Sequence, residues 1–327
     1  MEKKKGEIFY GKVILFGEYG IIYDSMALTI PFTHYHGELS FSNKNDRYKY
    51  TDYDFAVNSN NQLRRFAEEL NGLKRSNKLK VNLDIDALLK DIEKGLFFES
   101  TIPQGFGLGS SGALVASVYS RYSKEKIESS RSISKDDILK LKESLSLLEN
   151  YFHGTSSGID PLNSYIKFPL LIHSKKNIQT VAIPKSKFEA NSAIFLVNTG
   201  KPGKTEPMVN KFLENCKQPD YLSAIINQFL PMNNTCIRHL INGEMKAFFE
   251  ELTSLSRFQY TYFADMIPDD FKPVWKHGFD SNEYTIKLCG SGGGGFLLGF
   301  TQNLNEALQY FSSLLCKILL PAGSDQV

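Results

Sequence analysis

The stretch PQGFGLGSSGALVASVYSRY, residues 103–122, decides how the rest of the sequence is interpreted. Glycine recurs at every second position, two hydroxyl residues follow, and a run of small and apolar residues completes the stretch. The positions are Gly105, Gly107, Gly109, Ser110 and Ser111. Glycine accepts positive φ angles and lets the backbone approach a ligand closely. When such a loop opens a helix, free N–H groups and the positive end of the helix dipole point at one place, which suits a phosphate.

Other interpretations of the glycine pattern stay open at this point. Residues 107–112 and 290–295 both fit the GxGxxG pattern of dinucleotide-binding loops, but neither has a convincing acidic ribose partner within a βαβ unit. No Walker lysine follows either loop, which excludes an ordinary P-loop. The simplest alternative is a glycine-rich turn without a ligand, although paired serines on such a turn are typical of phosphate and metal sites.

The composition limits the class of protein. The 327 residues are 42% hydrophobic, which is enough for a large core and two domains. Lys and Arg number 38 against 36 Asp and Glu, so nucleic acid is not an expected partner. Gly17 and Glu18 interrupt the apolar run near the start of the chain, which predicts neither a signal peptide nor a membrane span. Four cysteines without CxxC spacing suit a reducing cytoplasm.

Hydrophobic periodicity predicts an α+β protein. Strands are expected at residues 8–15, 21–23, 27–30, 80–85, 96–102, 163–172, 178–183 and 193–197, and on both sides of the glycine turn within 286–300. Helices are expected at residues 62–73, at 138–148, over most of 207–263, and before a closing strand within 303–319. Residues 3–5 are interpreted as a solvated tail, residues 39–50 as an exposed hairpin, and the polar residues 184–191 as a domain boundary.

Three charged residues lie at positions where a charge without a partner is energetically unfavourable. Lys12 lies within an apolar strand, Glu18 in the turn after it, and Glu149 at the end of a helix, where an acid opposes the dipole. The ordinary explanations are a lysine at a sheet edge, a turn glutamate and a frayed helix end. The functional explanations are an active-site cation, a polar contact to a substrate or metal, and a metal ligand.

A second loop of glycine and hydroxyl residues, HGTSSGID, occupies residues 153–160. Asp160 at its end is able to take a proton from a substrate hydroxyl within hydrogen-bond reach, or to form an Asx turn before Pro161. His153 is interpreted as structural. Residues 198–205 form a further loop that carries two cations and two hydroxyl groups.

Together these segments resemble the GHMP kinases, the family of galactokinase, homoserine kinase, mevalonate kinase and phosphomevalonate kinase. Residues 11–19, 103–111 and 287–295 are similar to the three motifs of the family and occur in the family's order. Glu149 and residues 153–160 keep the spacing of the catalytic loop of mevalonate kinases. Tyr19 and Gly112 instead resemble phosphomevalonate kinases at the corresponding positions.

The resemblance implies a role for each candidate residue. Asp160 would accept the proton of the attacking hydroxyl, with Lys12 paired to it, and Ser111 and Glu149 would hold Mg²⁺. The residues on the phosphates of ATP would be Gly105, Gly107, Leu108, Gly109, Ser110, Ser111, Gly112, Gly292, Gly293 and Gly294. The residues near the acceptor and the transferred group would be Glu18, Tyr19 and Thr205.

The resemblance also implies a fold and a reaction. A β-rich N-terminal ATP-binding domain (residues 1–187) and a ferredoxin-like C-terminal domain of helices on an antiparallel sheet (residues 188–327) would form the two-domain GHMP kinase fold, with the active site in the cleft. The enzyme would transfer the γ-phosphoryl group of ATP, with Mg²⁺, to a small-molecule alcohol. Mevalonate is favoured, in isoprenoid precursor synthesis. Phosphomevalonate, a sugar, and a catalytically silent nucleotide-binding regulator are the alternatives. A cytoplasmic homodimer that binds neither nucleic acid nor membrane fits this resemblance.

Overall fold

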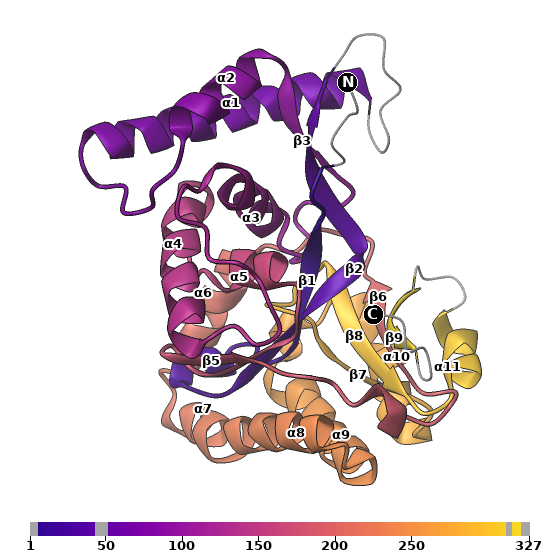
Figure 1. The fold of residues 1–327 in the computed structure, drawn as a ribbon. Helices are drawn as coiled ribbons and strands as arrows, with labels where there is room; N and C mark the ends of the chain where they lie inside the picture. Colours follow the sequence, from indigo (N-terminus) through magenta and orange to yellow (C-terminus); the bar gives the residue numbers. More distant parts are fainter. Residues whose placement is uncertain (1–5, 43–51, 312–315, 322–327) are drawn as a thin grey trace. The chain divides into compact units, whose positions relative to one another are not determined.

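The computed structural model describes residues 6–42, 52–311 and 316–321 (Figure 1). The chain divides into two compact units. Unit 1 comprises the described residues up to Lys12, Ile30–Pro103 and Leu108–Phe168. Unit 2 comprises Val13–Thr29, Gln104–Gly107 and the described residues from Pro169 onward. The domain boundary expected between residues 187 and 188 stays a prediction.

Two long strands, β1 (Phe9–Phe16) and β2 (Ala27–Phe41), have residues in both units. In unit 1, β2 pairs antiparallel with β3 (Leu96–Ser100), and the absence of a side chain at Gly37 leaves room for the ring of Phe98. In unit 2, the start of β2 pairs antiparallel with β4 (Leu170–Ser174), which pairs with β5 (Asn177–Thr180).

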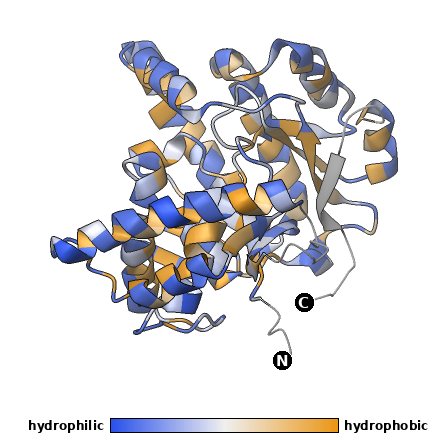
Figure 2. Ribbon diagram, turned by 90° about the horizontal axis from the view of Figure 1, so that it is seen from above, coloured by the Kyte–Doolittle hydropathy of each residue, from blue (hydrophilic) through white to orange (hydrophobic). Residues whose placement is uncertain are grey.

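Five helices complete unit 1. They are α1 (Tyr53–Arg75), α2 (Ile85–Glu93), α3 (Ser110–Tyr122), α4 (Lys135–His153) and α5 (Ile159–Ile166). The apolar stripe expected on α1 at Leu63, Phe66, Leu70 and Leu73 is confirmed at the first three positions, while Leu73 is half-buried. The stripe expected on α4 is confirmed at all four of its positions, Ile138, Leu141, Leu145 and Leu148. Hydrophilic and hydrophobic residues share the helical ribbons in Figure 2, as this amphipathic pattern requires.

Unit 2 contains a four-stranded antiparallel sheet in the order β7-β8-β6-β9. Its strands are β6 (Ala193–Asn198), β7 (Thr285–Leu288), β8 (Phe296–Thr301) and β9 (Cys316–Pro321). The Ser256 hydroxyl of α9 (Met245–Tyr262) donates to the Ile286 carbonyl of β7 at 2.6 Å. It accepts from the Trp275 indole of α10 (Lys272–Ser281) at 2.9 Å. These contacts confirm the predicted packing of helices on an antiparallel sheet.

The helices of unit 2 are α6 (Thr205–Asn215), α7 (Pro219–Ala224), α8 (Leu230–Asn242), α9 (Met245–Tyr262), α10 (Lys272–Ser281) and α11 (Leu304–Phe311). A π-helical turn, η3 (Ile225–Phe229), joins α7 to α8. Short 3₁₀ segments are η1 (Gly20–Tyr23), η2 (Lys185–Lys187), η4 (Ala264–Met266) and η5 (Asp269–Phe271). Within the described ranges, no helix is long and apolar enough to cross a bilayer.

Two predicted strands and the beginning of a third are wrong, while residues 170–172 of the third do begin β4. Residues 21–23 belong to η1, and residues 80–85 form only one isolated bridge, Leu83 to Ser123, before α2 begins. The Asp84 carboxylate accepts from the Ala87 N–H and caps α2, so alternating residues before it lead into a helix. Residues 163–166 lie in α5, where Asp160, Asn163 and Ser164 share one helix face at i, i+3 and i+4. Asn163 and Ser164 are nevertheless buried, so α5 is not an ordinary amphipathic surface helix.

Two expectations fall wholly or partly on residues that the structure does not describe. The tail at residues 3–5 lies outside the described residues. The same holds for residues 43–50 of the expected hairpin, while the described beginning of that segment continues β2 as far as Phe41, with Leu39 buried.

Candidate active site

The N-terminus of α3 is open in the way that the glycine loop predicts. Gly109 occupies the N-cap position with φ 74°, and no side chain caps the helix. A Cβ atom at Gly109 would lie 3.1 Å from the Lys12 side chain, a tight contact, and 3.6 Å from Asp160, an ordinary one, so the positive φ is the main reason for glycine here. The N–H groups of the first helical turn have no intrahelical partners, and the helix dipole favours an anion there.

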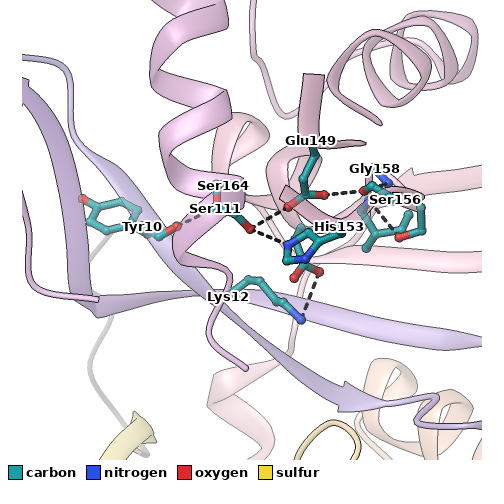
Figure 3. A network of polar contacts seen from close by, with 11 residues as sticks. Tyr10, Lys12, Ser111, Glu149, His153, Ser156, Gly158 and Ser164 are labelled. Carbon is teal, nitrogen blue, oxygen red and sulfur yellow. Dashed lines mark hydrogen bonds and ion pairs between the residues drawn. The ribbon is translucent and has the colours of Figure 1, made fainter. Parts of the chain in front are cut away.

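Lys12 and Asp160 form an ion pair beside this helix start. The Lys12 ammonium lies 3.0 Å from the Asp160 carboxylate, and their side chains are 5% and 33% exposed. Strand β1 holds Lys12 through its backbone N–H, which donates to the Leu108 carbonyl at 2.9 Å. Helix α5 carries Asp160 in its first turn and is fixed to β1, because the Ser164 hydroxyl donates to the Tyr10 carbonyl at 2.8 Å (Figure 3).

Glu149 lies at the centre of a hydrogen-bond network (Figure 3). Its carboxylate accepts from the Ser111 hydroxyl at 3.0 Å and from the Ser156 hydroxyl. Burial and the negative charge of Asp160 raise the pKa of Glu149, while the hydrogen bonds from Ser156 and Ser111 lower it. The structure therefore brings Lys12, Ser111, Glu149 and Asp160 together within unit 1.

These groups fit a magnesium ion better than a transition metal. A hydroxyl and two carboxylates that sense each other's charge are the oxygen donors that Mg²⁺ prefers. In the part of the chain that the structure describes, no group of three or more His, Cys, Asp or Glu side chains could hold a metal by itself. Magnesium commonly completes its coordination with water and phosphate oxygens, so a sparse protein contribution suits it.

Two members of this network, His153 and Ser156, were missed in the sequence. The Nε2 atom of His153 lies 3.0 Å from the Ser111 hydroxyl. Because Ser111 donates to Glu149, it accepts from His153 in an arrangement that satisfies both contacts. The four-residue spacing of Glu149 and His153 on α4 places both on one helix face and was the available signal.

We predict opposite stability effects for alanine at two helical glycines. A Cβ atom at Gly112 would lie 2.8 Å from backbone atoms of Asp160 and Pro161, so Gly112→Ala forces α3 and α5 apart and destabilises the fold by about 1–3 kcal/mol. Gly72 of α1 has open space around it, so Gly72→Ala stabilises by about 0.5–1 kcal/mol. Urea unfolding of both variants measures the difference, and a Gly112→Ala protein as stable as wild type contradicts the packing described here.

The remaining candidate residues lie in unit 2, where Glu18 and Lys287 form a fully buried ion pair. The Lys287 ammonium lies 2.6 Å from Glu18 Oε1, and their side chains are 0% and 1% exposed. Burial raises the pKa of Glu18, and Lys287 and the Gly290 backbone N–H oppose the shift. Glu18 therefore lies in an internal pair with the strand before the second glycine loop, and its acceptor contact stays a prediction.

Tyr19 is held in a strained conformation next to this pair. Its φ of 59° falls in the region that favours glycine, which costs about 1–3 kcal/mol in a non-glycine residue. The ring stacks on Phe212 with centroids 4.5 Å apart, and the hydroxyl donates to the Ser291 carbonyl. Desolvation raises the pKa of Tyr19, so the hydroxyl keeps its proton for this bond.

The second glycine loop, residues 290–295, is built from five residues with positive φ. The N–H groups of Gly293 and Gly295 donate to the carbonyls of Met266 and Lys201, both at 2.7 Å. The Ser291 hydroxyl lies 3.5 Å from that of Thr205, the first residue of α6. Residues 104–107 of the first glycine loop belong to the same unit, where the Gly105 carbonyl accepts from the Gly203 N–H at 3.0 Å.

Comparison with known proteins shows which fold the chain shares. The family model described as the GHMP kinases N-terminal domain matches residues 65–165, which contain Ser111, Glu149 and Asp160. This match confirms the resemblance read from the sequence, and the chain has the two-domain GHMP kinase fold. A search of curated protein sequences found no match.

Mevalonate kinases and a phosphomevalonate kinase are among the solved structures that resemble the chain. The Leishmania major mevalonate kinase in complex with R-mevalonate has a TM-score of 0.64 at 15% identity, covering 98% of both chains. The Methanococcus jannaschii mevalonate kinase has a TM-score of 0.62 at 17% identity, covering 97% of this chain and 98% of that one. The Streptococcus pneumoniae phosphomevalonate kinase, complexed with phosphomevalonate and AMPPNP, has a TM-score of 0.62 at 16% identity, covering 96% and 98%. Identities this low show a shared fold and leave the substrate to be determined.

Proposed function

We propose that this protein is an ATP-dependent kinase that phosphorylates mevalonate. The observation that carries the proposal is the 3.0 Å pair of Lys12 and Asp160 beside the open N-terminus of α3. The N–H groups at an open helix start bind phosphate, and a carboxylate beside them is able to accept a proton from a substrate hydroxyl. The matched GHMP kinase domain and the structural similarity to mevalonate kinases support the same reaction.

Asp160 is the proposed general base. As the acceptor oxygen forms its bond to the γ-phosphorus, its proton passes to the Asp160 carboxylate, and the bond from phosphorus to the β,γ-bridging oxygen breaks. Lys12 orients that carboxylate and offsets the negative charge that gathers around the transferred group. Because phosphoryl transfer has a loose transition state, positioning and charge neutralisation account for most of the catalysis.

Ser111 and Glu149 would hold the magnesium ion. When bound, Mg²⁺ supplies positive charge to the phosphates of ATP. Ser156 and His153 keep the Glu149 carboxylate and the Ser111 hydroxyl in place through the bonds described above. The remaining phosphate contacts are proposed for the residues of the two glycine loops, and an acceptor contact for Thr205.

Mevalonate is favoured over phosphomevalonate by the catalytic loop from Glu149 to Asp160, whose spacing is that of mevalonate kinases. Tyr19 and Gly112 support phosphomevalonate as the second candidate, and the neighbour solved with phosphomevalonate has a similar TM-score. A silent regulator is disfavoured, because such a protein would be expected to lack the base or the metal ligand, and both candidates are present.

The test is an ADP-release assay of the purified protein with Mg²⁺ and ATP, run separately with mevalonate, phosphomevalonate and galactose. We expect turnover with mevalonate and a phosphate ester as product, identified by mass spectrometry. Turnover only with phosphomevalonate or galactose would transfer the proposal to that acceptor. ATP binding without turnover on any of the three would contradict the kinase.

A further inference from the structure

The turn after β1 makes several separate contacts with the segment that carries the second glycine loop. The Glu18 carboxylate is paired with Lys287 of β7, and the backbone N–H of Gly290 also interacts with it. The next residue, Tyr19, donates its hydroxyl to the Ser291 carbonyl. Lys287 also donates to the Leu288 carbonyl at 2.7 Å. Two successive residues of the turn therefore contact the glycine-loop segment at two places. Glu18 contacts Lys287 in the strand that precedes the loop, and Tyr19 contacts Ser291 within the loop.

The turn itself is rigidly anchored. At its far end, the Asn234 side chain of α8 accepts from the Ser25 hydroxyl at 2.7 Å and from the Met26 N–H at 3.0 Å. Asn233, 1% exposed, donates to the Met26 carbonyl at 2.8 Å. The aromatic ring of Tyr19 stacks on Phe212 with centroids 4.5 Å apart, and the tilted ring of Phe263 lies 5.3 Å away. These contacts hold the turn at both of its ends.

The glycine loop needs a support of this kind. Glycine loses more conformational freedom on ordering than any other residue, and this loop contains five glycines with positive φ. Gly293 and Gly295 have backbone partners, but Ser291, between Gly290 and Gly292, is held through its carbonyl by Tyr19. The Ser291 hydroxyl in turn approaches that of Thr205 at 3.5 Å.

We propose that Glu18 and Tyr19 are positioning residues that set the shape of the 290–295 loop for nucleotide phosphate, rather than ligands of the acceptor. Both side chains are buried inside unit 2. One carboxylate oxygen of Glu18 faces Lys287, the other is buried without a hydrogen-bond partner among the described residues, and the hydroxyl of Tyr19 donates to Ser291. The inference rests on the proposed kinase function for its kinetic consequence, while its structural part is independent of that function.

The test compares Tyr19→Phe with wild type and with Tyr284→Phe, a matched control. Tyr284 is a buried tyrosine of the same unit whose hydroxyl also donates to a backbone carbonyl, that of Val274 at 2.7 Å. For Tyr19→Phe we expect KM for MgATP to rise about fivefold, as the loss of one hydrogen bond allows, with kcat and the acceptor KM nearly unchanged. Tyr284→Phe should leave all three constants as in wild type.

Hydrogen exchange supplies a readout that does not depend on turnover. In Tyr19→Phe the amides of residues 289–295 should exchange about fivefold faster than in wild type, and in Tyr284→Phe they should not. Replacing only Glu18 or only Lys287 would leave an unpaired buried charge, so the two are replaced together by the neutral pair Glu18→Gln/Lys287→Met. In this double variant the amides of residues 289–295 should also exchange faster than in wild type. This measurement remains decisive if the protein proves not to be a kinase.

Two results would overturn the inference. A raised acceptor KM in Tyr19→Phe, with loop exchange and MgATP binding as in wild type, would make Tyr19 an acceptor ligand. Unchanged loop exchange in both the Tyr19→Phe and the Glu18→Gln/Lys287→Met proteins would show that the turn does not hold the loop at all.

Discussion

Asp160→Asn is expected to lower kcat by about 10²–10⁴-fold, the usual contribution of a positioned general base. Asparagine has nearly the shape of aspartate but accepts no proton, and it leaves the 5% exposed Lys12 ammonium without its charged partner. Steady-state kinetics with the acceptor found active in the ADP-release assay measure the loss. MgATP binding, followed by calorimetry, should persist because α3 is unchanged.

The matched control for this substitution is Asp86→Asn, since the Asp86 side chain is 75% exposed and lies on α2. It should keep full activity. Adding Lys12→Met to Asp160→Asn should lower kcat little further, because groups that act as a unit are not additive. An Asp160→Asn protein that retains more than about a tenth of wild-type kcat would contradict its role as base.

Glu149→Gln is expected to raise the Mg²⁺ concentration needed for half-maximal activity, and to lower activity at fixed Mg²⁺, by about 100-fold. The amide offers a weaker oxygen donor without charge and disturbs the hydrogen bonds from Ser111 and Ser156. A magnesium titration of initial rates measures the shift. Partial recovery at high Mg²⁺ would separate a binding defect from a loss of fold.

Glu143→Gln is the control for this experiment, because Glu143 is an exposed glutamate on the same helix, α4. Its magnesium titration should overlay that of wild type. If Glu149→Gln loses activity with an unchanged magnesium requirement, Glu149 does not hold the metal, and its buried position serves only the packing of the loop before Asp160.

The candidate catalytic residues could be predicted because their signals are local. Alternating glycines with paired serines predict an open helix start, and the structure has one at Ser110. Lys12 and Glu149 could be identified because a charge in an apolar strand, or an acid at the C-terminal end of a helix, is energetically costly without a partner. The resemblance to the motifs of GHMP kinases then linked both residues to Asp160. The 3.0 Å ion pair confirms that Lys12 and Asp160 lie together.

The contacts that join distant segments could not be predicted. Glu18 and Lys287 are 269 residues apart, and nothing near either residue indicates the other. Tyr19 likewise meets a backbone carbonyl, which carries no signature in the sequence. Amphipathic α1 and α4 were predicted from their apolar stripes, whereas the second half of α5, a helix of only eight residues that is buried almost throughout, was mistaken for a strand.

Helix α5 has a consequence for how the protein should respond to heat. Only eight residues long, it carries Asp160 at one end and is fixed by Ser164 to β1 and by close approach to Gly112. A segment this short has no stability of its own and exists only while its neighbours stay packed against it. Thermal inactivation should therefore occur no later than the melting of tertiary structure in unit 1, and activity should never outlast that melting.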